Sequence, residues 1–131
     1  ANEGSMLNTP NTFGWYVAGK MFDWYLENGG VAEMEKQSIA KTDMLYELID
    51  KSDFYVNPVN PEQRSINNVV FTIVNSELEK VFLEEAEKAD LRYLKGHRTV
   101  GGMRASIYNS MKIESVSVLK DFMENFEKNY G

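Results

Sequence analysis

The chain of 131 residues has room for one ordinary domain but not for a second complete one. With 43% hydrophobic and 26% charged residues, its composition is that of a folded globular protein rather than a disordered segment. The net charge of -6 argues against non-specific binding to nucleic acid or to membranes, because both require a basic surface, and the absence of cysteine excludes disulfides and thiolate metal sites.

No apolar run approaches the roughly 18 residues of a membrane span, and the first residues do not resemble a signal peptide. We therefore expect a cytoplasmic protein that binds neither membrane nor nucleic acid. Because no methionine begins the chain, we also expect it to be part of a longer protein.

The first predicted helix has Thr9 as its N-cap and Pro10 in the first helical position, and it runs to Leu26 or Glu27, before an Asn-Gly-Gly sequence. Apolar residues lie on two of its sides, namely Phe13, Val17, Met21 and Trp24 on one and Trp15, Ala18, Phe22 and Leu26 on the other. A helix that is apolar over most of its surface is buried on several sides. We expect this helix to lie between the domain and another domain or subunit.

The second predicted helix runs from Val31 to about Ile49, and its solvent-facing positions are expected to be Glu33, Glu35, Lys36 and Lys41. Two short strands follow, Phe54–Val56 and Val69–Val74, which could pair as neighbours.

A capping-box pattern, Ser76 with Glu79, precedes the third predicted helix. From Met103 onward, apolar and polar residues alternate, which predicts a strand that turns Arg104 away from the core. A last amphipathic helix runs from about Val116 to Tyr130. The order helix, helix, strand, strand, helix, strand, helix predicts a small α+β sandwich, with a short sheet covered mainly on one face.

The stretch GHRTVGGMRAS, residues 96–106, holds the single histidine and two of the four arginines. An arginine on a strand is a rigid fork for a carboxylate or phosphate, so Arg104 is a candidate for one anionic group, and His97 with Arg98 for a second. The ordinary alternative, which residue types alone favour, is a salt-bridged arginine beside a glycine turn.

Asn8 and Thr9 precede a helix, whose free N–H groups favour an anion such as a phosphate, although from the residues alone simple capping is the better explanation. The chain contains no catalytic constellation and no cluster of metal ligands. The residues therefore predict that the chain binds anions but does not itself catalyse a reaction.

Six stretches together resemble the phosphoserine aminotransferase family, pyridoxal-phosphate enzymes of serine biosynthesis. They are SMLNTPNTFGWY at 5–16, NGGVAEMEK at 28–36, LYELIDKSDFY at 45–55, RSINNVVF at 64–71, FLEEAEKADL at 82–91 and KGHRTVGGMRASIYN at 95–109. The resemblance implies the small-domain sandwich of this enzyme class, with residues 1–30 as a segment and interdomain helix and residues 31–131 as the C-terminal small domain. Asn11 and Asn67 depart from the family pattern, which commonly has proline and methionine there.

By this resemblance, Arg104 binds the substrate α-carboxylate, His97 and Arg98 bind the substrate phosphate, and Asn8 and Thr9 reach the cofactor phosphate of the neighbouring subunit in a homodimer. The implied reaction transfers the amino group of glutamate to 3-phosphohydroxypyruvate and yields phosphoserine. The large domain with its cofactor-bound lysine would lie upstream, so we expect no catalytic residue, no bound pyridoxal 5'-phosphate and no activity in this chain alone.

Two other classes of function remain open at this stage. The chain could be a free-standing regulatory module that binds a phosphorylated amino acid. It could also be an interaction domain whose apolar first helix docks on a partner while Arg104 forms an ordinary salt bridge.

Overall fold

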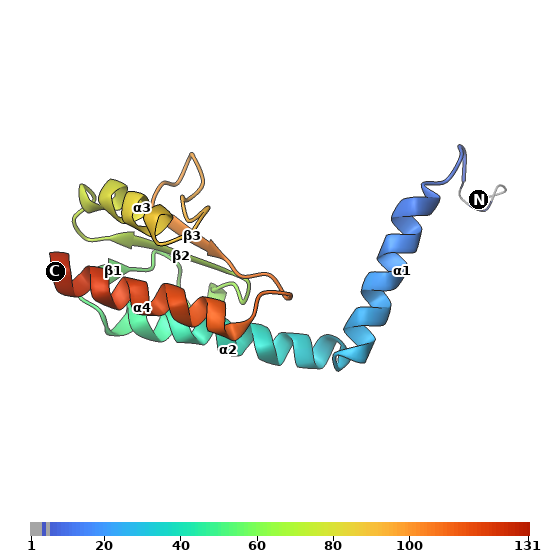
Figure 1. Cartoon of the computed structure of the whole chain (residues 1–131), viewed down its shortest axis with the longest axis horizontal. Coiled ribbons are helices and arrows are strands. Elements are labelled where there is room, and N and C mark those ends of the chain that lie inside the picture. The colour runs from blue at the N-terminus through green and yellow to red at the C-terminus, as the bar shows by residue number, and fades with distance from the viewer. Residues whose placement is uncertain (1–3, 5) are drawn as a thin grey trace. The chain divides into compact units, whose positions relative to one another are not determined.

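The computed structural model describes residue 4 and residues 6–131 (Figure 1). In this part of the chain the helices and strands follow one another as α1 (Thr12–Glu27), α2 (Gly30–Lys51), β1 (Tyr55–Val56), η1 (Pro61–Gln63), β2 (Asn68–Ile73), α3 (Leu78–Lys88), β3 (Met103–Ser106) and α4 (Ile113–Tyr130). The predicted order of α-helices and strands is confirmed, with a short 3-10 helix, η1, added. None of the described helices has the length and hydropathy needed to cross a membrane.

The chain divides into two compact units, residues 1–34 and residues 35–131. The first unit contains α1, which begins later than the sequence predicts. Asn11, not Thr9, is the N-cap, and its Oδ1 accepts the N–H of Gly14 at 2.9 Å. The N–H of Thr12 donates to the carbonyl of Pro10, which therefore lies in a turn before the helix. The prediction was wrong because asparagine caps at least as well as threonine, and Asn11 stands directly before the first helical residue.

The end of α1 falls where it was predicted. Asn28 is the C-cap, with its N–H donating to the carbonyl of Trp24 at 3.1 Å, and Gly29 follows with a φ of 92°. No residue of α1 is buried, and large apolar side chains such as Phe13 and Leu26 are exposed. The helix thus presents a broad apolar surface within the part of the chain that the structure describes.

The second unit is built on an antiparallel sheet in the order β1-β2-β3. Tyr55 pairs with Ile73 between β1 and β2, so these strands are neighbours, as the sequence allowed. Val70 pairs with Arg104 between β2 and β3. The central position of β2 explains its run of β-branched residues, which pack well on a pleated surface.

One face of the sheet is buried and the other is open. Along β2 and β3 the buried side chains are Val69, Phe71, Ile73, Met103 and Ala105, and those between them are only half-buried, namely Val70, Thr72, Arg104 and Ser106. This alternation confirms the predicted strand at Met103 and the predicted one-sided cover. The pleat therefore places Arg104 on the open face.

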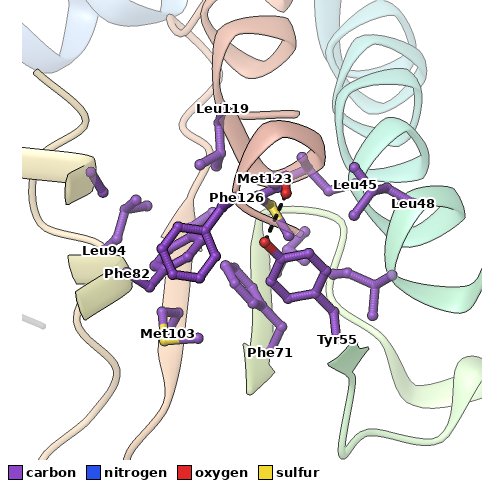
Figure 2. Packing of buried hydrophobic residues seen from close by; sticks show 14 of the residues in the cluster. Leu45, Leu48, Tyr55, Phe71, Phe82, Leu94, Met103, Leu119, Met123 and Phe126 are labelled. Carbon is purple, nitrogen blue, oxygen red and sulfur yellow. Dashed lines mark hydrogen bonds between the residues drawn. The ribbon is translucent and has the colours of Figure 1, made fainter. Parts of the chain in front are cut away.

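Aromatic rings from the sheet and the helices meet in the core (Figure 2). The ring of Phe82 on α3 lies 5.7 Å from that of Phe71 on β2 and 5.0 Å from that of Phe126 on α4. The hydroxyl of Tyr55 donates to the carbonyl of Met123 at 2.9 Å, and burial raises the pKa of this tyrosine. These contacts fix α3 and α4 against the same face of the sheet.

The capping box predicted for α3 is absent. The helix begins at Leu78, and its N-cap, Glu77, makes no side-chain capping bond. Instead, Oδ1 of Asn75 accepts the N–H of Glu77 at 3.2 Å, forming a turn ahead of the helix. Ser76 therefore lies one residue too early to act as the N-cap in a box with Glu79.

Candidate anion-binding site

Residues 94–104 form a hairpin that leads into β3. The N–H of Gly96 donates to the carbonyl of Gly102 at 2.8 Å, and the N–H of Arg104 donates to the carbonyl of Leu94 at 2.7 Å. A Cβ on Gly96 would overlap the carbonyl of Gly101, and Gly101 and Gly102 have φ values of 80° and 62°. The glycines are thus required by the close approach of the two arms of the hairpin and by the left-handed backbone. The turn that the sequence offered as the ordinary explanation does exist.

The loop at the tip of this hairpin is held by its own hydrogen bonds. The carbonyl of His97 accepts the N–H groups of Val100 at 2.9 Å and Gly101 at 2.8 Å. The side chains of His97 and Arg98 are exposed. The loop therefore presents an imidazole and a guanidinium from a fixed backbone.

His97 and Arg98 line one groove of about 610 Å³ between the loop and α3. Lys80 and Lys95 add two ammonium groups to the same groove. Its α3 wall also carries the carboxylates of Glu79, Glu84 and Glu87. Lys80 forms an exposed ion pair with Glu84 at 3.8 Å, so the positive charge is concentrated on the loop side, where His97 and Arg98 stand together.

Arg104 lines a different hollow, of about 480 Å³, beside Tyr93, Tyr108 and Leu119. Its Nε is buried and has no hydrogen-bond partner among the described residues. Within the same residues, no carboxylate forms an ion pair with it. The salt-bridged arginine expected from residue types alone is therefore not found, and a buried donor without a partner is costly unless a ligand or another part of the protein satisfies it.

The structure thus brings His97 and Arg98 together and places Arg104 in a separate hollow on the same hairpin. Asn8 and Thr9 belong to the first unit, where they are exposed and precede α1. Among the described residues, no group of histidine and acidic side chains is arranged to hold a metal ion.

Lys41 is a polar residue that sequence analysis placed wrongly. The residue was expected to face solvent, but it is 2% exposed, and its Nζ donates to the carbonyls of Tyr108 at 3.0 Å and Met111 at 3.1 Å. Burial lowers the pKa of its ammonium group. The helical period could have predicted that Lys41 is buried, because Lys41 lies four and seven residues before the buried Leu45 and Leu48.

A buried lysine with a lowered pKa has the character of a covalent nucleophile. Lys41 does not suit that role, because its Nζ is enclosed and already donates to backbone carbonyls of the loop that follows β3. Its role in the described chain is to hold this loop against α2.

Comparison with known proteins gives one consistent family. Residues 1–119 match the model of the aminotransferase class-V family. Among curated proteins, phosphoserine aminotransferase of Pseudomonas aeruginosa strain LESB58 is 52% identical over 131 residues, which are 100% of this chain and 36% of that protein. The chain therefore spans about a third of the length of the curated relatives it matches.

Solved structures agree with the sequence comparison. Phosphoserine aminotransferase from Bacillus circulans subsp. alkalophilus superimposes with a TM-score of 0.93 at 39% identity, covering 99% of this chain and 36% of that one. The pyridoxal-phosphate-bound phosphoserine aminotransferase of Trichomonas vaginalis superimposes with a TM-score of 0.85 at 36% identity, covering 94% of this chain and 36% of that one. The predicted α+β small-domain fold and the predicted family are both confirmed.

Proposed function

Because the chain belongs to the class-V aminotransferases, we propose that it is the C-terminal part of a phosphoserine aminotransferase. Residues 31–131 would form the small domain, and residues 1–30 a leading segment and interdomain helix. The large domain would precede this chain and carry the lysine that bonds to the cofactor. The whole enzyme would act in the cytoplasm as a homodimer and transfer the amino group of glutamate to 3-phosphohydroxypyruvate.

The observation that carries this proposal is that the basic side chains on the hairpin are available to bind anions. Arg104 has a buried Nε without a partner in the described chain, and His97 and Arg98 stand exposed on a fixed loop. A substrate with two anionic ends satisfies both groups. Arginine suits both carboxylate and phosphate, because its planar fork of donors stays charged at any working pH.

Each substrate carries an α-carboxylate and a second anionic group, which is a phosphate in 3-phosphohydroxypyruvate and the γ-carboxylate in glutamate. Arg104 would bind the α-carboxylate, which glutamate and phosphoserine share. His97 and Arg98 would bind the phosphate, which only the phosphorylated substrate carries. The side chains of this chain thus bind and orient the substrate. Their match to its anionic groups determines which substrate is accepted.

Pyridoxal phosphate, when bound, carries the amino group between the two substrates. Asn8 and Thr9 would contact its phosphate in the neighbouring subunit. The described residues fit this role, because Asn11 rather than Thr9 caps α1. The Thr9 hydroxyl is therefore not committed to the helix, and it stands just ahead of an N-terminus whose dipole favours an anion.

The proposal can be tested in a chimera in which this chain replaces the corresponding part of the Pseudomonas aeruginosa enzyme. Arg104→Ala should raise the KM for both glutamate and 3-phosphohydroxypyruvate. Arg98→Ala should raise the KM for the phosphorylated substrate more than that for glutamate, because the phosphate carries the greater negative charge. Each loss of a charge-assisted hydrogen bond should cost about ten- to a hundredfold in kcat/KM.

Lys128→Ala is the control, because Lys128 is an exposed basic residue near the end of α4 and lines neither hollow. It should leave both KM values unchanged. Equal effects of Arg98→Ala on the two substrates, or no effect of Arg104→Ala on either, would contradict the assignment of these residues.

A further inference from the structure

The imidazole of His97 is held by the residue two positions after it. Nδ1 of His97 lies 2.7 Å from Oγ1 of Thr99, and the backbone N–H of Thr99 points to the same Nδ1 at 3.3 Å. A backbone N–H is only a donor, so Nδ1 must act as an acceptor. In the neutral ring this assigns the proton to Nε2.

The backbone under this ring is also fixed. The carbonyl of His97 accepts two N–H groups of its own loop, and Gly96 has no room for a side chain. The position of the ring and the identity of its free donor are therefore both set by hydrogen bonds within five residues. Arg98, between the two partners, is exposed and lines the groove.

We propose that Thr99 is a positioning residue for the phosphate site. Its hydroxyl donates to Nδ1 of His97 and so keeps Nε2–H as the donor offered to an oxyanion. This inference rests on the proposed function, because it explains how a neutral histidine would donate a hydrogen bond to the substrate phosphate. Without the hydroxyl, the ring loses the shorter of its two contacts at Nδ1. In part of the molecules the proton then moves to Nδ1, and the lone pair of Nε2 repels the phosphate oxygens.

The single histidine of the chain allows a direct test without any ligand. The ring nitrogens of His97 are observed by long-range 1H–15N NMR of the labelled chain at about pH 8.5, where an ordinary histidine is neutral. The chain and its Thr99→Ser variant should show only the tautomer with Nε2 protonated. Thr99→Val, which keeps the size and the backbone N–H, should show a mixture of both tautomers.

The same variants in the chimera test the consequence for the substrate. Thr99→Val should raise the KM for 3-phosphohydroxypyruvate about three- to tenfold, the loss of one hydrogen bond, with kcat little changed and a smaller effect on the KM for glutamate. Thr99→Ser should restore the KM. Val100→Ala is the control within the loop, because Val100 is exposed and contributes only its backbone N–H.

The outcomes separate this inference from the proposed function. A single unchanged tautomer in Thr99→Val, or an unchanged KM in that variant while His97→Ala raises it, would overturn the role of Thr99 alone. If His97→Ala leaves the KM for the phosphorylated substrate unchanged, the assignment of the phosphate site is wrong, and the role of Thr99 as a positioning residue falls with it.

Discussion

Arg64 shows how one side chain fixes a segment that has little secondary structure of its own. Its guanidinium forms two hydrogen bonds with the carboxylate of Asp50, at 2.6 and 2.7 Å, and lies 4.8 Å from the ring centre of Tyr46. The hydroxyl of Tyr46 donates to the carbonyl of Ser65 at 2.7 Å. Together these contacts attach the loop before β2 to α2. The hydrogen bond from Arg64 lowers the pKa of Asp50.

Replacing Asp50 should therefore destabilise the chain in a pH-dependent way. Because the pKa of Asp50 is lower in the folded chain, its contribution is present above the ordinary aspartate value of about 3.9 and is lost as the pH falls through the lowered pKa. Asp50 is half exposed, so Asp50→Asn should cost only about 1 kcal/mol at neutral pH. Urea unfolding at about pH 7 and about pH 3 measures both values, and the cost should shrink at the lower pH.

Asp121→Asn serves as the control for this measurement, because Asp121 is exposed on α4. It should change the free energy of unfolding little at either pH. If Asp50→Asn costs as much at low pH as at neutral pH, the ion pair with Arg64 does not supply the stability assigned to it.

Among the elements, α2 and the loop after β3 are joined by Lys41. Its Nζ donates to carbonyls of that loop, and the neighbouring Ser38 hydroxyl donates to Oδ1 of Asn109 at 3.3 Å. The loop directly follows the strand that carries Arg104. Lys41 thus stabilises the far end of the segment on which the candidate site is built.

Lys41→Met should lower the free energy of unfolding by about 2 kcal/mol, because it removes a charged donor and leaves carbonyls without their partner. Lys51→Met is the matched control on the same helix, since Lys51 is exposed and forms a surface ion pair with Glu47. It should cost less than about 0.5 kcal/mol. Chemical denaturation of the two variants gives both values, and equal costs would show that the buried contacts of Lys41 contribute nothing.

The periodicity of apolar residues predicted which helices and strands form, but it did not predict where the helices α1 and α3 begin. The alternation of apolar and polar residues from Met103 predicted β3 and the position of Arg104 on its open face. Such an alternation is present in the sequence because only one face of the strand is buried. The starts of α1 and α3 were misplaced, since several adjacent residues are good caps and only the three-dimensional turn decides among them. The contact of Thr99 with His97 was not predicted, because no sequence pattern specifies the path of a loop.

For the candidate site, residue types grouped His97 with Arg98 and assigned Arg104 to a second anionic group, and these roles stay predictions. His97 and Arg98 share one groove, whereas Arg104 lines another. Separation along the sequence does not determine which hollow a side chain enters, because that depends on how the hairpin packs against α3 and α4. The absence of an ion pair for Arg104 among the described residues likewise required the structure.

For the whole molecule, two observations support the proposal that this chain is part of a larger enzyme. The chain spans 36% of the length of its Pseudomonas aeruginosa relative, and α1 has no buried residue although most of its surface is apolar. Burial of such a helix is favourable at about 25 cal/mol per Å² of apolar area. We expect the upstream part of the enzyme to cover it, and we expect the covalent chemistry to lie there too.

The central claim is that this chain binds the substrate anions while the lysine that bonds to the cofactor lies outside it. The most direct measurement is to reduce the active chimera with borohydride and locate the cofactor-modified lysine by mass spectrometry. We predict one modified lysine, in the upstream part, and none among the ten lysines of this chain. Stoichiometric modification of Lys41 or of any other lysine in these 131 residues would contradict the account.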